Sequence, residues 1–124
     1  MGIERARRML DAYGARALDR TCTAAESAYI LSRPNASQHF AARLAAKEAA
    51  YKALAGTAPA RRVGWREIEV AANAGGPPAL VFHGLALVRA VELGVGRAWV
   101  SLTHGDGVAV AMVVLEGPDR PGSG

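Results

Sequence analysis

The chain has 124 residues, of which 51% are hydrophobic and 21% charged, which is sufficient for one globular domain with a real core. Its formal net charge of +4 and pI of 9.8 favour an anionic partner, namely nucleic acid, a phosphorylated cofactor or an acidic protein. Nucleic acid ranks last of the three, because the basic residues are scattered without a Lys/Arg block and aromatic residues make up only 6% of the chain.

Simple features of the sequence exclude a membrane-spanning protein and a protein stabilised by disulfides. Charges interrupt every apolar run before it reaches membrane length, and residues 1–8 lack the apolar core of a signal peptide. Cys22 is the only cysteine, which excludes an intramolecular disulfide and any metal site built from cysteines. A cytoplasmic protein is therefore expected.

The first third of the chain predicts three short helices, over residues 3–13, about 16–20 and 24 to about 32. Gly14 is suited to end the first helix, which carries arginines on its outer face. Thr23 and Glu26 have the spacing of a capping box, with threonine at N-cap and glutamate at N3. Pro34 then marks a break before the next helix.

Residues 37–56 predict a central helix of about five turns, because alanine and leucine fill most of the segment. Asn35 and Gln38 can cap its start, and Gly56 can close its end. Four charged residues stand out on it: Arg43, Lys47, Glu48 and Lys52.

Glu48 and Lys52 are four residues apart and share a helix face, while Arg43 and Lys47 lie on adjoining rows. One interpretation is an ordinary ion pair on a solvated face. The other is functional: Glu48 serves as a metal ligand or base, and the cations receive phosphate.

The second half of the chain predicts mostly antiparallel strands. A loop covers residues 57–64, strands cover 65–71, 79–83, 98–103 and 108–116, and a helix covers 84–93. The fold class is therefore α+β, with helices packed on a small antiparallel sheet. One domain spans residues 1–117, and residues 118–124 form a flexible tail.

His104 to Gly107 is expected to form the turn between the last two strands. His104 can bind phosphate, act in catalysis or be an exposed loop residue, and Asp106 with Gly107 is first a turn former. The sequence has no Ser-His-Asp signature, no Walker-type phosphate loop and no zinc motif.

The order of the segments is more specific than any one of them. Five segments follow one another along the chain: Thr23-Ala-Ala-Glu26, Phe40-Ala-Ala-Arg-Leu-Ala-Ala-Lys-Glu-Ala-Ala-Tyr-Lys-Ala-Leu54, Gly56-Thr57, Trp65-Arg-Glu-Ile-Glu-Val70 and Val100-Ser-Leu-Thr-His104. This order closely resembles the holo-acyl-carrier-protein synthases, small bacterial members of the 4′-phosphopantetheinyl transferase superfamily. The resemblance covers residues 4–116, nearly the whole chain.

The resemblance implies that coenzyme A and apo-acyl carrier protein react to give holo-carrier protein and adenosine 3′,5′-bisphosphate, with Mg²⁺ on the pyrophosphate. A carrier serine attacks the β-phosphate, a step that mainly requires neutralised charge. By residue matching, Glu48 would be a metal ligand and Lys52 would lie beside the phosphates. Arg43 and His104 would touch the nucleotide end, at its 3′-phosphate. Lys47 and the turn Gly56-Thr57 would lie near the cofactor.

Partner contacts are also implied. Arg5, Arg8 and Met9 occupy the region that in the family docks the acidic helix of the carrier protein. The family assembles as a homotrimer with active sites between subunits. The apolar run 108–115 is compatible with such an interface, although a core strand would have the same pattern.

The sequence departs from the family pattern at its start. Family members carry a Gly-Ile-Asp strand before the first helix, and its aspartate is the second metal ligand; in our alignment it falls upstream of Met1. Glu4 and Asp11 are the nearest acids and neither is in register. Smaller departures are Ala25, Ala58 and Val108, where the family has Pro, Gly and an aromatic residue.

Three hypotheses follow. The first is an active Mg²⁺-dependent synthase with an Asp-bearing strand encoded upstream. The second is a catalytically silent paralogue that binds coenzyme A or a carrier protein, and the third is a basic module for nucleic acid. Which carrier protein is served, in fatty acid, polyketide or peptide synthesis, stays open, as does the selectivity among coenzyme A thioesters.

Overall fold

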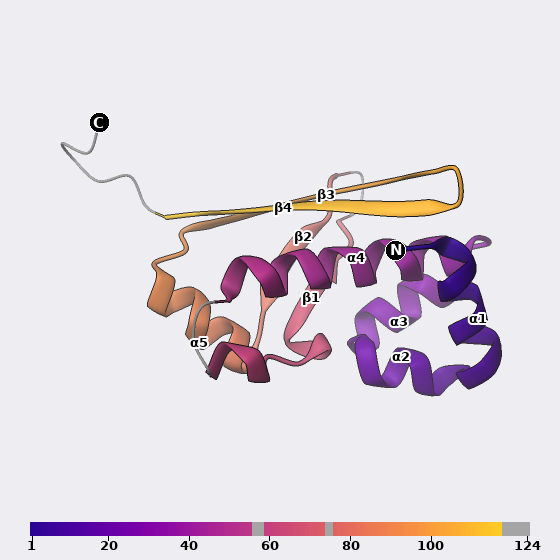
Figure 1. The fold of residues 1–124 in the computed structure, drawn as a ribbon, viewed down its shortest axis with the longest axis horizontal. Helices are drawn as coiled ribbons and strands as arrows, with labels where there is room; N and C mark the ends of the chain where they lie inside the picture. Colours follow the sequence, from indigo (N-terminus) through magenta and orange to yellow (C-terminus); the bar gives the residue numbers. More distant parts are fainter. Residues whose placement is uncertain (56–58, 74–75, 118–124) are drawn as a thin grey trace.

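The computed structural model describes residues 1–55, 59–73 and 76–117. Within these ranges the helices are α1 (Ile3–Tyr13), α2 (Ala15–Thr21), α3 (Ala24–Leu31), α4 (Ala36–Leu54) and α5 (Gly84–Leu93), with short 3₁₀ turns at Pro59–Arg62 and Trp65–Glu67. The strands β1 (Ile68–Ala71), β2 (Ala79–Phe82), β3 (Arg97–Gly105) and β4 (Val108–Glu116) form two antiparallel hairpins. This α+β arrangement agrees with the expected fold class (Figure 1).

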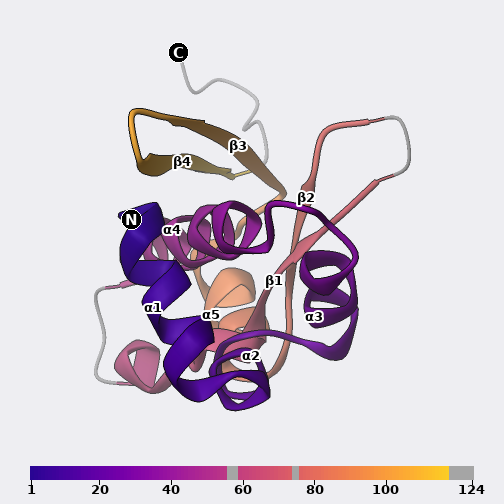
Figure 2. The ribbon, with the colours of Figure 1, turned by 90° about the vertical axis from the view of Figure 1, so that its right-hand side faces the viewer.

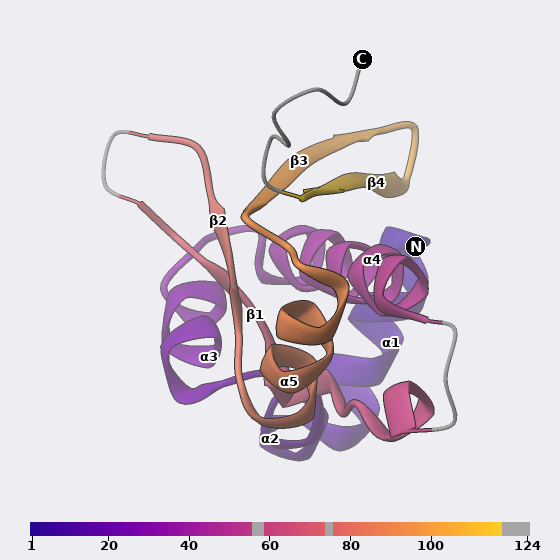
Figure 3. The ribbon, with the colours of Figure 1, turned by 90° about the vertical axis from the view of Figure 1, so that its left-hand side faces the viewer.

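The 19-residue helix α4 is the centre of the fold. The β3–β4 hairpin covers one side of it, and α1, α2, α3 and α5 lie on the other (Figures 1 and 2). In the end-on views the β1–β2 hairpin lies on the opposite side of the molecule from α1 (Figure 3). Because neighbours surround α4, nine of its residues are buried, including Phe40, Leu44 and Leu54.

Two apolar clusters divide the core along α4. Phe40 and Leu44 pack with residues of α1, α2 and α3 and with Ala109 of β4. Leu54 packs with Val63, Ile68 and residues of α5, and the half-buried side chains of β4 close this second cluster. The many alanines of α4 permit these close approaches because they add little volume.

The helix ends show which local predictions hold. Thr23 Oγ1 accepts from the Glu26 amide at 3.3 Å and Glu26 Oε1 accepts from the Thr23 amide at 2.9 Å, so the predicted capping box is confirmed. Asn35 stands at the N-cap of α4, but its side chain makes no capping bond, so that predicted cap is wrong. Its backbone carbonyl instead accepts the amides of Gln38 and His39. The predicted end at Gly56 lies outside the described residues.

The predicted strand over residues 65–71 is only half correct. Trp65–Glu67 forms a 3₁₀ turn, because the Glu67 carboxylate accepts the amide of Gly64 at 3.1 Å and those of Leu85 and Ala86 at the start of α5. Gly84 suits this close approach, since it has φ +52° and an added Cβ would lie 2.6 Å from Glu67 Oε2.

The predicted turn at residues 104–107 is shorter than expected. His104 lies within β3 and pairs with Ala109, and Gly105 pairs with Val108. Only Asp106 and Gly107 form the turn, with φ of 51° and 78°. Two positive φ values are typical of a type I′ turn, whose twist matches that of the flanking strands. His104 is therefore held by a β-ladder rather than by a turn.

The chain begins against β4. The amide of Ile3 donates to the Gly107 carbonyl at 2.8 Å, and the amide of Ala109 donates to the Met1 carbonyl at 2.9 Å. Gly2 and Val108 form an antiparallel bridge, so helix α1 is anchored to the hairpin at its first residue. Within the described ranges, none of the helices combines the length and apolar character that crossing a bilayer requires.

Candidate active site

One pocket of about 300 Å³ opens beside the second half of α4. It brings together Glu48 and Lys52 of α4 with Arg61 and the segment around Trp65. The full lining is Lys47, Glu48, Tyr51, Lys52, Arg61, Val63, Gly64, Trp65 and Ile68. Glu48 and Lys52 are both exposed, so their charged groups are available to a ligand.

Glu48 is the only carboxylate among the described residues that line this pocket. Neither Glu48 nor Lys52 takes part in an ion pair within the described part of the chain, so the i,i+4 pair of the structural interpretation is not formed there. Among the described residues, no cluster of three His, Cys, Asp or Glu side chains is suited to hold a metal alone. Mg²⁺ commonly uses one or two carboxylates and completes its shell with phosphates and water, and a single Glu48 fits that use.

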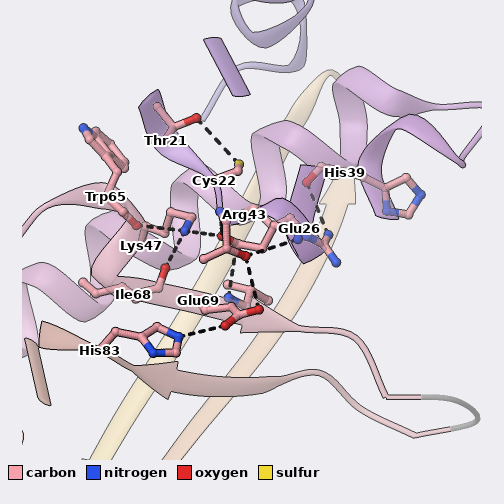
Figure 4. A network of polar contacts seen from close by, with 12 residues as sticks. Thr21, Cys22, Glu26, His39, Arg43, Lys47, Trp65, Ile68, Glu69 and His83 are labelled. Carbon is pink, nitrogen blue, oxygen red and sulfur yellow. Dashed lines mark hydrogen bonds and ion pairs between the residues drawn. The ribbon is translucent and has the colours of Figure 1, made fainter. Parts of the chain in front are cut away.

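Lys47 lines the pocket but is only 1% exposed, and its ammonium lies in a network of polar contacts with Glu26, Trp65 and Ile68 (Figure 4). Its ammonium donates to Glu26 Oε1 at 2.7 Å, to the Trp65 carbonyl at 2.9 Å and to the Ile68 carbonyl. All three donors of the ammonium therefore have protein acceptors. Contact between Lys47 and the cofactor stays a prediction.

A second pocket of about 540 Å³ lies beside the first half of α4 and brings Arg43 together with His104 of β3. Its lining also includes Tyr29, Arg33, His39 and Asn73, and no carboxylate occurs among the described residues that line it. The accumulation of cationic and polar groups without an acid suits an anionic ligand.

Arg43 is only 3% exposed and stacks on the Tyr29 ring, with its guanidinium carbon 4.3 Å from the ring centroid. Its terminal nitrogen reaches the His39 carbonyl at 3.4 Å (Figure 4). Its Nε has no hydrogen-bond partner within the part of the chain that the structure describes. Burial lowers the pKa of Arg43 from its ordinary value, as expected of a desolvated cation.

Sequence reasoning missed Tyr29, Arg33 and His39 as members of this pocket. Tyr29 and Arg33 belong to α3 and the turn after it, and only the packing of α3 beside α4 brings them to Arg43. His39 is four residues before Arg43 on α4, and that helical spacing is a signal from which its position on the same face follows.

The remaining predicted residues lie elsewhere. Arg5 and Arg8 are exposed on α1, and Met9, on the same face, is half-buried against the first apolar cluster. Gly56 and Thr57 lie outside the described residues. The structure thus gathers the α4 residues and His104 into two pockets and keeps the α1 residues apart from both.

The sequence and the fold match known proteins over nearly the full length. Residues 2–113 match the model of the 4′-phosphopantetheinyl transferase superfamily. The holo-[acyl-carrier-protein] synthase of Koribacter versatilis is 45% identical over 114 residues, which are 92% of this chain and 90% of the relative.

Solved structures show the same fold. The Neisseria meningitidis holo-[acyl-carrier-protein] synthase has a TM-score of 0.79 at 24% identity, covering 94% of this chain and 92% of that one. The Bacillus anthracis synthase, solved in complex with coenzyme A (3′,5′-ADP), has a TM-score of 0.73 at 28% identity, covering 95% and 91%. The chain belongs to the 4′-phosphopantetheinyl transferase superfamily, as one of its holo-[acyl-carrier-protein] synthases.

Proposed function

We propose that this protein transfers 4′-phosphopantetheine from coenzyme A to a serine of apo-acyl carrier protein, with Mg²⁺ and with release of adenosine 3′,5′-bisphosphate. The observation that carries the proposal is the pair of pockets on α4. Glu48 and Lys52 line one, and Arg43 and His104 line the other. From residue 43 to residue 52 the helix rises by roughly 13 Å, so one extended ligand with phosphates at two places can bridge both pockets.

The reaction exchanges one phosphorus–oxygen bond for another. The serine oxygen bonds to the β-phosphorus, the bond to the bridging pyrophosphate oxygen breaks, and that oxygen leaves with the nucleotide. The serine proton is released to solvent. Negative charge grows on the leaving phosphate, so positioned cations are the main contribution that the protein makes.

Glu48 is assigned as a protein ligand of Mg²⁺, in agreement with its exposed carboxylate and its place as the acid of the pocket. When bound, the ion supplies positive charge to the pyrophosphate. Lys52 lies one helical turn further on and is assigned to the leaving phosphate. Lys47 is assigned to the pocket wall, since three protein oxygens already accept its protons.

The nucleotide end is assigned to the second pocket, where Arg43 and His104 would receive its 3′-phosphate. The unpartnered Nε of the buried Arg43 supports this, because a desolvated guanidinium nitrogen is stabilised by an anionic acceptor. Gly56 and Thr57, which follow α4, are assigned to the region near the pyrophosphate.

The carrier protein is assigned to α1. Arg5 and Arg8 are three residues apart, exposed on one helix face, and Met9 adds an apolar contact beside them. An acidic carrier helix complements this face, and the net charge of +4 agrees with acidic and phosphorylated partners.

The working assembly is assigned as a homotrimer with active sites between subunits. The outer face of the β3–β4 hairpin carries exposed apolar side chains, namely Trp99, Val108, Val110, Met112 and Val114, with exposed fractions of 43% to 67%. A face of this kind is typical of a contact with another protein chain, and further copies of this chain are the partner we propose.

The decisive experiment is a transfer assay with coenzyme A, Mg²⁺ and apo-acyl carrier protein, read by the mass gain of the carrier. The wild-type chain is expected to modify the carrier, and Glu48→Ala is expected to abolish the gain while keeping the thermal unfolding midpoint. His83→Gln, an exposed change outside both pockets, serves as the control. Binding of coenzyme A without any transfer by the wild type would instead support the silent-paralogue hypothesis.

A further inference from the structure

Two basic groups of the second pocket, Arg33 and His39, have no role in the proposed reaction. The guanidinium carbon of Arg33 lies 4.6 Å from the centroid of the Tyr29 ring, and the His39 ring meets Tyr29 edge-on, with centroids 5.5 Å apart. Arg43 stacks on the same ring at 4.3 Å. Tyr29 therefore holds three nitrogen-rich side chains around one aromatic ring.

These groups come from neighbouring elements of the fold. Tyr29 is on α3, Arg33 is in the turn that follows, and both His39 and Arg43 are on α4. Stacking on an aromatic face and an edge-on contact each restrict a side chain, which lowers the entropy lost when a ligand binds. His104 reaches the same pocket from β3, which pairs it with Ala109.

The pocket lacks a counter-charge among its described lining residues. Two guanidinium groups and two imidazoles meet there, and Arg43 keeps a buried Nε without a partner among the described residues. Of these four groups Arg43 is the buried one, and because an unsatisfied buried guanidinium nitrogen is costly to a fold, an anionic ligand would offset that cost.

We propose that Arg33 and His39 bind the same terminal phosphate monoester as Arg43 and His104, and that Tyr29 positions them for it. The inference rests on the proposed function, because it takes the nucleotide end of coenzyme A as the source of the phosphate. With these four residues on the phosphate, the second pocket would distinguish coenzyme A from its 3′-dephospho form.

His39 gives this recognition a pH dependence. Burial, followed by the charges of Arg43, Arg33 and His104, lowers the pKa of His39, so the ring is neutral in the free protein near pH 7. A phosphate dianion favours the protonated ring, and binding then takes up a proton. The groups that face His39 are Tyr29, Arg33, Arg43 and His104, and no acid lies among them. Phosphate itself begins to protonate near pH 6, so binding is expected to tighten from pH 8 to about pH 6.5.

The test measures dissociation constants of coenzyme A and 3′-dephospho-coenzyme A by calorimetry. Arg33→Gln and His39→Phe are each expected to weaken coenzyme A binding about tenfold and to change binding of the dephospho form by less than about twofold. His39→Phe keeps an aromatic ring against Tyr29 and is also expected to remove most of the pH dependence. Arg20→Gln and His83→Gln, exposed residues outside both pockets, are the matched controls for charge and for imidazole.

If a variant weakened the binding of both ligands equally, the proposal would be overturned, because the substitution would then act generally on the fold or on the electrostatic field of the site. An unchanged affinity for coenzyme A in both variants would overturn it as well. The transfer assay run in parallel separates the two claims: a wild-type chain that binds coenzyme A in preference to its dephospho form without transferring it would contradict the proposed function and leave the phosphate site standing.

Discussion

Lys47 Nζ and Glu26 Oε1 lie 2.7 Å apart in the interior of the protein, with side chains 1% and 0% exposed. The pair joins α4 to α3, and three further bonds reach the Trp65–Val70 segment: Lys47 donates to the Trp65 and Ile68 carbonyls and Glu26 accepts the Val70 amide at 2.9 Å. The Thr23 amide also donates to Glu26 Oε1. Removing two charges from water is costly, and this arrangement compensates by satisfying each of their polar atoms. It also fixes the wall of the pocket directly beside Glu48.

Replacing one partner of this pair is expected to destabilise the protein strongly. Lys47→Met leaves the Glu26 carboxylate and two carbonyls without their donor, and the loss is expected to be about 3–5 kcal/mol. Denaturant unfolding followed by circular dichroism measures it. Lys52→Met, which removes the same charge from an exposed position of the same helix, is expected to change stability by less than about 0.5 kcal/mol.

The double variant Glu26→Gln/Lys47→Met separates the charge from the packing. It removes both charges, so it is expected to recover part of the stability lost in Lys47→Met. If Lys47→Met unfolds with the wild-type midpoint and transfers phosphopantetheine more slowly, Lys47 acts on the substrate directly and the positioning assignment is wrong.

Lys52 is expected to matter for the chemical step. Lys52→Met removes a cation from the exposed rim of the first pocket, and kcat is expected to fall about 10²–10³-fold, the usual cost of removing one group that stabilises transition-state charge. Lys52→Arg keeps the charge and is expected to retain more activity than Lys52→Met. Steady-state kinetics with the carrier protein provide the measurement. An unchanged kcat with a raised KM would instead indicate simple substrate binding.

The elements that follow local rules could be predicted from the sequence. The capping box at Thr23 and the left-handed Gly94 that ends α5 each depend on residues within one turn. The four charged residues of α4 that line the pockets, Arg43, Lys47, Glu48 and Lys52, were also identified, because their charges stand out against alanine and match a known motif.

What the sequence could not supply depends on contacts between distant elements. The role of Lys47 depends on Glu26, which is 21 residues away, and on carbonyls of a segment that was expected to be a strand from Trp65. The side chain of Glu67 replaces the first part of that strand with a 3₁₀ turn through bonds to α5. The periodic pattern of apolar residues in the sequence does not predict such bonds.

The outer face of the β3–β4 hairpin is expected to hold the subunits together. Met112 is 67% exposed on this face, and Met112→Glu would place a charge in each copy of the proposed interface. The assembly is expected to dissociate to monomer, measured by light scattering after size-exclusion chromatography. Ser101→Glu, at the position paired with Met112, is expected to act in the same direction. A trimer that persists in both variants would rule out this face as the interface.

The acid stability of the fold is expected to depend on His39. The pKa of this ring is lowered in the folded protein by burial and then by its cationic neighbours, whereas in the unfolded chain it is near 6.5. The contribution of neutral His39 to the free energy of unfolding is fully present above pH 6.5. It is lost as the pH falls through the folded pKa, because the unfolded state takes up the proton first. Between pH 7.5 and pH 5 the free energy of unfolding is therefore expected to fall by less in His39→Phe than in the wild type.

Cys22 is expected to be unreactive in the native protein. It is 1% exposed, and burial raises the pKa of its thiol, with the Thr21 hydroxyl at 3.6 Å as its hydrogen-bonding neighbour. Burial reduces both the fraction of thiolate, which attacks a disulfide reagent, and the access of the reagent to the sulfur. A thiol–disulfide reagent at pH 8 is expected to modify the native chain many times more slowly than the chain in denaturant, and the colour released on modification gives both rates.

Because Cys22 packs with Phe40 and Leu44 in the first apolar cluster, the native rate also reports how often that part of the core opens. Rapid modification of the native chain at the rate of a free thiol would show that this cluster opens readily in solution, contrary to the close packing around Cys22.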